Sequence, residues 1–162
     1  MYEYNCTVER VVDGDTIDVV LDLGFSVLYK SRVRLYAIDT PESRTRDKDE
    51  KVRGKMAGKF LSDAVSSGSV VIRTELKDSK GKYGRVLGTV VVDGVDINQA
   101  MCDKFLAVPY FGQNKAAVEA AHLSNRTKLI ELGQFDPTTV SSLSLIHISE
   151  PTRPERIAYA GL

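Results

Sequence analysis

The spacing of the apolar residues changes near residue 50 of this 162-residue chain. Before that point they alternate with polar residues or form short runs rich in Val, Ile, Leu and Tyr, which is typical of β-strands. Strands are expected at residues 6–12, 15–22 and about 27–38. Thr40-Pro41 is expected to end the third strand, because proline lacks the N–H that a central strand donates.

After a polar loop from Glu42 to about Lys51, the apolar spacing becomes helical. The residues at this spacing are Val52, Met56, Ala57, Phe60, Leu61 and Ala64. They predict a helix that packs one face on the sheet and ends at Ser66-Ser67-Gly68. Gly54 and Gly58 lie inside this helix and are expected to weaken it, because glycine has a low helix propensity.

Two further strands are expected at residues 70–76 and 86–92, and two helices follow them. Asp96 can cap a short helix that runs to about Phe105. A last helix is expected from about residue 115 to about residue 133, and one of its sides carries Ala116, Ala120, Leu123, Thr127 and Ile130. This order favours an α+β fold, in which a five-stranded β-barrel of the oligonucleotide-binding type carries three packed α-helices.

The chain is expected to form one domain followed by a tail. Residues 1–136 supply every strand and helix of the expected barrel, and this is enough chain for a hydrophobic core. Residues 137–162 show no hydrophobic periodicity, and the stretch LSLIHISEPTRP within them resembles a read-through peptide found at the ends of unrelated sequences. We interpret residues 137–162 as a disordered or non-native tail.

Composition narrows the choice of partners and compartment. The formal net charge is zero, which argues against a protein that coats nucleic acid through bulk attraction, although basic residues gather between Lys30 and Lys59. Cys6 and Cys102 lie far apart and are expected to be buried or half-buried thiols rather than a disulfide. The chain shows neither a membrane-spanning stretch nor the pattern of a signal peptide, so we expect a cytoplasmic monomer with no membrane partner.

The sequence contains two similar Asp-Gly turns, and only one of them has a chemical context. Val92-Asp93-Gly94 and Val12-Asp13-Gly14 both lie between β-rich runs, which is a strong signal for a hairpin. After Gly14 come Asp15 and Thr16, and a second carboxylate cluster follows at Asp39. The first turn is therefore expected to supply a ligand, whereas the second is expected to be only a turn.

Four short stretches together indicate a site. They are Asp13-Gly14-Asp15-Thr16, Arg34 with the nearby Asp39-Thr40-Pro41-Glu42, Lys82-Tyr83-Gly84-Arg85, and Tyr110. Each stretch alone is a turn or a loop by default. Together they bring carboxylates, two guanidinium groups and a phenol, which suits the attack of water on a phosphodiester.

Each residue type in this set fits a distinct task in that reaction. Asp15, Asp39 and the Thr40 carbonyl offer the oxygen ligands that Ca²⁺ prefers. Glu42 is placed to accept a proton from the attacking water or to orient it. Arg34 and Arg85 offer planar forks to the phosphoryl oxygens.

One spacing restricts this interpretation. Arg34 and Asp39 are an odd number of residues apart, so a regular strand would point their side chains to opposite faces. They share a site only if the strand ends or bulges before Asp39.

In order and in gaps, these motifs resemble the staphylococcal-nuclease-type thermonucleases over about residues 5–133. The resemblance implies the barrel fold with three helices and a Ca²⁺-dependent endo- or exonuclease that hydrolyses DNA and RNA and leaves 3′-phosphates. It also implies that Asp13 reaches the metal through water. Lys82 and Tyr83 resemble the residues that hold the terminal phosphate of a bound nucleotide, and Tyr110 resembles the tyrosine that stacks on the base.

Two alternatives stay open beside the enzyme. Barrels of this kind also occur as binding modules that have lost catalytic residues, and loss of Glu42 or of either arginine would favour that class. A structural Ca²⁺-binding domain would account for the aspartates but would not explain the presence of Arg34 and Arg85. Because Glu42 and both arginines are present, the sequence favours the enzyme.

Overall fold

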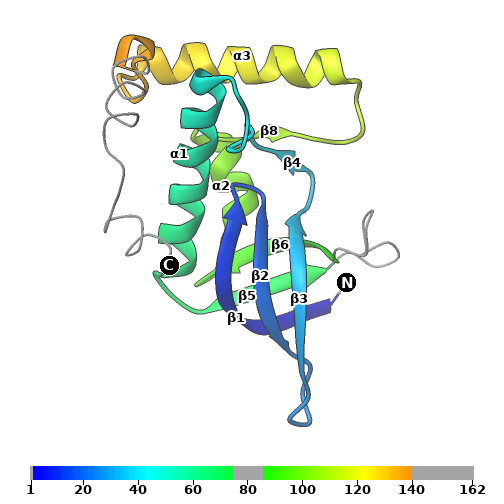
Figure 1. Ribbon diagram of the computed structural model, residues 1–162. Helices are drawn as coiled ribbons and strands as arrows, with labels where there is room; N and C mark the ends of the chain where they lie inside the picture. Colours follow the sequence, from blue (N-terminus) through cyan, green and yellow to red (C-terminus); the bar gives the residue numbers. More distant parts are fainter. Residues whose placement is uncertain (1, 75–85, 140–162) are drawn as a thin grey trace.

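The strands of the first half close into a barrel in the computed structural model, which describes residues 2–74 and 86–139. The barrel strands are β1 (Tyr2–Asp13), β2 (Thr16–Asp22), β3 (Leu28–Leu35), β5 (Val70–Thr74) and β6 (Val86–Val92). They follow the order β3-β2-β1-β5-β6 with antiparallel neighbours, and a parallel pairing of β3 with β6 closes the ring. The predicted oligonucleotide-binding-type barrel is confirmed (Figure 1).

Three helices, three very short strands and a helical turn at residues 137–139 complete the described part of the chain. The helices are α1 (Lys48–Val65), α2 (Ile97–Asp103) and α3 (Lys115–Glu131), and the short strands are β4 (Ile38–Asp39), β7 (Val95–Asp96) and β8 (Val108–Pro109). Helix α1 begins earlier than the apolar spacing predicted, because Asp47 caps it by accepting a hydrogen bond from the Glu50 amide at 3.1 Å. Asp96 caps α2 in the same way, as predicted.

The core fills the barrel with aliphatic side chains that alternate along the strands. Ile17, Val19, Val33, Ile72 and Val90 are fully buried there, and Ala57 and Leu61 of α1 and Met101 of α2 pack on the same cluster. Each such side chain stabilises the fold by about 1.5–3 kcal/mol relative to an exposed position. The barrel is therefore a rigid support for groups at its ends.

The third strand breaks where the site requires it to break. β3 ends at Leu35, Ala37 has a positive φ of 64°, and β4 resumes at Ile38. β4 then leaves the barrel and pairs with β8, with Asp39 opposite Val108. The break removes the odd-spacing conflict, and Arg34 and Asp39 come into contact.

Helix α3 lies across the end of the molecule, beyond α1 and the β4–β8 ribbon (Figure 1). Most of the side predicted to carry its apolar contacts is wrong: Leu123 is 59% exposed, and Ala116, Ala120 and Thr127 are exposed as well, whereas Ile130 is partly buried against the core. The inward side instead carries His122, Asn125, Arg126 and Leu129. Polar groups at helical spacing dock this helix, and apolar periodicity could not reveal them.

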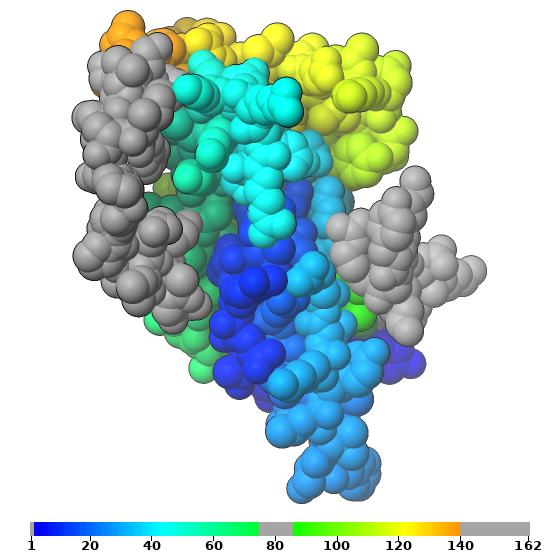
Figure 2. Space-filling view, viewed as in Figure 1, coloured from blue at the N-terminus to red at the C-terminus, as the bar shows by residue number. Residues whose placement is uncertain are grey.

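The opposite end of the barrel carries a projecting hairpin. The loop between β2 and β3 extends as a knob away from the helices (Figure 2), and Phe25 at its tip is fully exposed with a φ of 54°.

Cys6 and Cys102 are free, as predicted, and burial raises the pKa of each thiol to about 11. In residues 2–74 and 86–139, no helix is both long and apolar enough to cross a membrane.

Two glycines allow backbone segments to approach α1 closely. A Cβ on Gly14 would lie 2.7 Å from the Ala57 Cβ, so this residue is needed for contact between the β1–β2 turn and the helix. Gly94, by contrast, has a φ of 84° and serves the turn itself.

A Cβ on Gly54 would lie 2.6 Å from the Glu42 carbonyl oxygen and 2.7 Å from that of Pro41. The expected cost of Gly54 to the helix is thus offset by the packing of the site loop against it.

Gly54→Ala is expected to destabilise the protein by about 1–3 kcal/mol, because backbone atoms of the site loop must move to accept the new methyl group. Gly58→Ala is the matched control on the same helix, since the nearest atom to its Cβ is the Gly14 amide nitrogen at 4.0 Å. It should stabilise the protein by up to about 1 kcal/mol through helix propensity. Urea unfolding of both variants measures the two effects, and a stabilising Gly54→Ala would contradict the proposed contact.

Candidate active site

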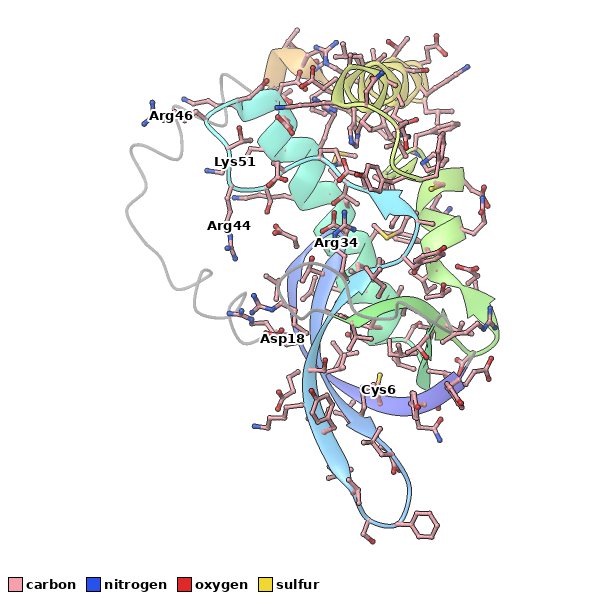
Figure 3. The ribbon with its side chains drawn as sticks, turned by 90° about the vertical axis from the view of Figure 1, so that its right-hand side faces the viewer. Cys6, Asp18, Arg34, Arg44, Arg46 and Lys51 are labelled. Atoms are coloured by element: carbon pink, nitrogen blue, oxygen red, sulfur yellow. The ribbon has the colours of Figure 1, made fainter. Side chains whose placement is uncertain are left out.

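Arg34 lies at the centre of the site, at the end of the barrel nearest the helices (Figure 3). Its Nη1 donates hydrogen bonds to the carbonyl oxygens of Leu35 at 3.1 Å and Ile38 at 3.0 Å. The same guanidinium contacts Asp15 Oδ2 and Asp39 Oδ1, each at 3.4 Å. The Arg34 side chain is 18% exposed, so these contacts form in a partly dehydrated setting.

The two aspartates reach Arg34 from different parts of the fold. Asp15 belongs to the β1–β2 turn, where the Thr16 hydroxyl donates to its Oδ1 at 3.0 Å. The backbone N–H of the buried Thr40 donates to Asp15 Oδ2 at 3.4 Å. Asp15, Asp39 and Thr40, which were predicted as metal ligands, are therefore neighbours.

Glu42 stands at the rim of this cluster, on the loop that Gly54 supports. Its backbone N–H donates to Glu50 Oε2 at 3.1 Å, which fixes the loop against the first turn of α1. Partial loss of its water shell raises the pKa of Glu42, and the negative charges of Asp13, Asp15 and other nearby carboxylates raise it further. Asp13 also accepts a hydrogen bond from the Ser43 hydroxyl, a contact that the sequence did not indicate.

The donor set suits a hard cation such as Ca²⁺. Asp15 and Asp39 contact one guanidinium, and the pKa of Glu42 is raised first by partial burial and then by the charges of Asp13, Asp15, Asp39 and Glu50. Within residues 2–74 and 86–139, no group of three or more His, Cys, Asp or Glu side chains is arranged to hold a metal. Two carboxylates with a backbone carbonyl therefore remain the candidate protein ligands, which would leave other positions to water.

The predicted substrate-binding residues fall partly within the described structure. Tyr110 follows β8, its backbone N–H donates to the Ala37 carbonyl at 2.7 Å, and its side chain is 42% exposed beside the ribbon. Its neighbour Phe111 is 80% exposed and was not predicted as a site residue. Lys82, Tyr83 and Arg85 lie outside the described residues.

Basic side chains surround the loop that carries Glu42. Arg44 and Arg46 on this loop and Lys51 on α1 project outward into solvent (Figure 3). Their exposure leaves the three charges accessible to solvent beside the loop.

A histidine contact is the main feature of the site that the sequence did not reveal. His122 of α3 lies with its Nε2 2.8 Å from Asp39 Oδ2, and the His122 side chain is 14% exposed. The chain contains only two histidines, so this rarity was an available signal. No spacing rule, however, connects residue 122 with residue 39.

A carboxylate with two arginine partners joins α3 to α1 near the site. Asp49 accepts hydrogen bonds from Arg53 Nε and Arg126 Nε, both at 2.8 Å. Arg53 is 6% exposed, and the Arg126 guanidinium lies 5.9 Å from the ring centroid of Phe135. Burial would raise the pKa of Asp49, but the hydrogen bonds from Arg126 and Arg53 outweigh burial and lower it.

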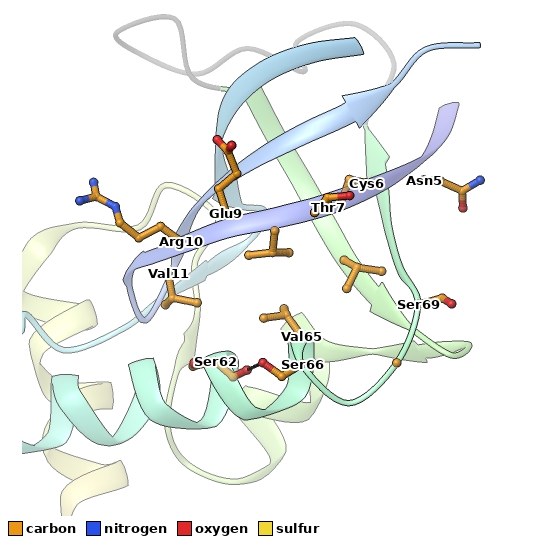
Figure 4. Close-up of a pocket in the computed structure, with 13 residues that line it drawn as sticks. Asn5, Cys6, Thr7, Glu9, Arg10, Val11, Ser62, Val65, Ser66 and Ser69 are labelled. Carbon is orange, nitrogen blue, oxygen red and sulfur yellow. Dashed lines mark hydrogen bonds between the residues drawn. The ribbon is translucent and has the colours of Figure 1, made fainter. Parts of the chain in front are cut away.

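A pocket between β1 and the end of α1 is separate from these residues. Glu9 and Arg10 line it on the strand, and Ser62, Ser66 and Ser69 line it on the other side (Figure 4). The Ser66 hydroxyl is already bonded to the Ser62 carbonyl at 2.8 Å. None of the predicted site residues lines this pocket.

Comparison with known proteins agrees with the fold. The family described as staphylococcal nuclease homologue matches residues 32–129, which is more than half of the chain. The chain belongs to this family. The matched region includes Arg34, Asp39, Thr40, Glu42 and Tyr110, whereas Asp13 and Asp15 precede it.

Three curated relatives illustrate the extent of the similarity. Endonuclease YncB of Bacillus subtilis is 33% identical over 103 residues, covering 64% of this chain and 46% of the relative. The SPbeta prophage-derived endonuclease YokF of the same species is 34% identical over 101 residues, covering 62% and 32%. Thermonuclease of Staphylococcus intermedius is 32% identical over 100 residues, covering 62% and 56%. The chain thus spans about half or less of these relatives' lengths.

Asp49→Asn is expected to lower the free energy of unfolding by about 1–3 kcal/mol at neutral pH, because two arginines lose a charged acceptor. The pKa of Asp49 is lowered in the folded state, so its contribution is present above the ordinary aspartate value of 3.8 and is lost as pH falls below that value. The difference between parent and variant should therefore shrink in acid. Urea unfolding from neutral to acidic pH measures it.

Asp63→Asn provides the matched control for this measurement. Asp63 pairs with Lys59 at 2.9 Å, but the side chains are 68% and 77% exposed. Its loss should change stability by less than about 0.5 kcal/mol. An equal effect at both sites would show that Asp49 does not join the helices in the way described.

Proposed function

We propose that this chain is a metal-dependent nuclease that hydrolyses phosphodiester bonds of DNA or RNA. The observation that carries the proposal is the shared contact of one guanidinium, that of Arg34, with two carboxylates that come from separate strand ends. Family membership and the names of the relatives, which call them endonucleases or thermonuclease, support the same activity. The proposed groups come from a single chain, so the activity requires no second copy.

Arg34 binds the phosphoryl group of the substrate in this proposal. Its Nη1 is engaged by backbone carbonyls, while in the described part of the chain Nε–H and one N–H of Nη2 have no hydrogen-bond partner. Nε and Nη2 form one edge of the guanidinium plane, and such an edge matches two phosphoryl oxygens. Arg85 is the proposed second fork, and it lies outside the described residues.

Glu42 accepts a proton from the attacking water or orients it. A raised pKa makes its carboxylate a stronger base than an ordinary glutamate. Its exposure at the rim leaves room for water, and Gly54 allows the backbone of the loop that carries Glu42 to approach α1 closely. The proton leaves the water as the bond to phosphorus forms, and Arg34 stabilises the charge that grows on the phosphoryl oxygens.

Asp15, Asp39 and the Thr40 carbonyl would hold Ca²⁺, and Asp13 would reach it through water. When bound, Ca²⁺ would neutralise charge on the phosphate and lower the pKa of a bound water. Lys82 and Tyr83 would hold the terminal phosphate, and Tyr110 would stack on a base. Cleavage that breaks the bond to the 5′-oxygen would leave 3′-phosphate products.

The first test measures metal dependence and product ends. Single-stranded DNA should be cut in Ca²⁺, left intact in excess chelator and cut again when Ca²⁺ is restored, because the carboxylate pair requires a counter-charge. A polymerase should extend the products only after phosphatase treatment, as 3′-phosphates block extension. Asp39→Ala should weaken Ca²⁺ binding more than Asp13→Ala does. Full cleavage in chelator would overturn the metal assignment, and directly extendable products would overturn the product assignment.

The second test separates chemistry at Arg34 from simple attraction of the substrate. Arg34→Lys keeps the charge but loses the planar fork, so single-turnover cleavage should slow by about 10²–10⁴ at saturating Ca²⁺ and substrate. Arg32→Lys is the matched control: Arg32 lies on the same strand, and it pairs with Asp18 at 2.8 Å outside the site. Its rate should stay near that of the parent. Equal rates for Arg34→Lys and the parent would sink the assigned role.

A further inference from the structure

The carboxylate of Asp39 is held by two different elements. Arg34 of β3 contacts its Oδ1 at 3.4 Å, and His122 of α3 lies 2.8 Å from its Oδ2. Of these two contacts, the one to His122 is the shorter. An ionised carboxylate can only accept hydrogen bonds, so the Nε2 of His122 must be the donor.

The other ring nitrogen agrees with this tautomer. His122 Nδ1 is buried and has no hydrogen-bond partner among the described residues. An imidazole that carries its proton on Nε2 leaves only an unprotonated acceptor at Nδ1, which is less costly to bury than an unpaired N–H. The ring is thus arranged to serve Asp39 through Nε2.

Helix α3 holds both strands of the ribbon that carries Asp39. One turn after His122, the Asn125 side-chain amide donates to the Ala107 carbonyl at 2.9 Å. Ala107 directly precedes Val108, which pairs with Asp39 across the ribbon. His122 therefore fixes the side chain of Asp39, while Asn125 fixes the strand that supports its backbone.

A separate contact anchors the helix itself. Arg126 donates to Asp49 of α1 at 2.8 Å, next to the inward-facing Asn125 and one turn after His122. This anchor makes no contact with Asp39. Substitution of Arg126 therefore removes an anchor of α3 without removing a contact to Asp39.

We propose that His122 is a positioning residue for the cation site, which fixes the Asp39 carboxylate so that its oxygens face the cation. The inference rests on the proposed function, because it takes Asp39 as a ligand of Ca²⁺. A carboxylate oxygen has two lone pairs, so the bond from Nε2 leaves capacity for a metal. Outer hydrogen-bond partners of metal ligands commonly contribute 10–100-fold to metal affinity.

The test compares two variants of equal reach. His122→Gln keeps an amide donor near the position of Nε2, whereas His122→Met has a similar length and helix propensity but no donor. Ca²⁺ is titrated calorimetrically into each protein without nucleic acid. His122→Met should raise the Kd for Ca²⁺ by about 10–100-fold, and His122→Gln should retain most of the parent affinity.

Arg126→Met is the control for a purely structural role of α3. It should lower the melting temperature and leave the Kd for Ca²⁺ close to that of the parent, since Arg126 does not contact Asp39. In cleavage assays, the rate of His122→Met should recover at saturating Ca²⁺, because only binding is impaired.

The outcomes distinguish the inference from the function beneath it. A parent that binds no Ca²⁺ would overturn the proposed function together with the inference. A parent that binds Ca²⁺, with an unchanged Kd in His122→Met or an equal loss in His122→Gln and His122→Met, would overturn the role of His122 alone.

Discussion

The break between β3 and β4 is the constraint on which the site depends. Without it, Arg34 and Asp39 would point to opposite faces of one strand. Ala37 adopts a positive φ of 64° at the break, which is unfavourable for a residue with a Cβ. Hydrogen bonds from Arg34 Nη1 to the carbonyls of Leu35 and Ile38 span the break and stabilise it. The group proposed to bind phosphate thus also holds the turn that brings Asp39 to it.

Apolar packing and polar hydrogen bonds support different parts of the site. The barrel and α1 form one apolar core, and Gly14 and Gly54 let the two site loops rest directly on α1. Helix α3 has Leu129 fully buried and Ile130 partly buried against the core, and beside these it makes the inward polar bonds of His122, Asn125 and Arg126. Such bonds are directional, so they fix where α3 lies relative to the ribbon more strictly than a smooth apolar face would. The barrel supplies stability, and α3 supplies orientation.

The apolar elements of the fold could be predicted from the sequence, whereas the polar contacts of α3 could not. Alternating and helical apolar spacing gave the barrel and α1, and the Asp caps gave the start of α2, because these signals are local. Most of the predicted side of α3 was wrong, Ile130 excepted, because several of the groups that dock this helix are polar. His122 was missed because 83 residues separate it from Asp39, and only tertiary structure brings them together. Arg34 and Asp39 could be paired in advance only on the condition that a strand break lay between them.

The zero net charge of the chain conceals a strong local separation of charge. Asp13, Asp15, Asp39 and Glu50 all raise the pKa of Glu42, so negative potential gathers at the end of the barrel. Arg44, Arg46 and Lys51 project from the neighbouring loop and helix into solvent. A polyanion that approached the carboxylates directly would be repelled, unless a cation and Arg34 offset their charge. The net charge sums all charged residues and does not show where they lie in the fold. It could therefore argue against bulk binding of nucleic acid, but it says nothing about a local site that depends on a cation.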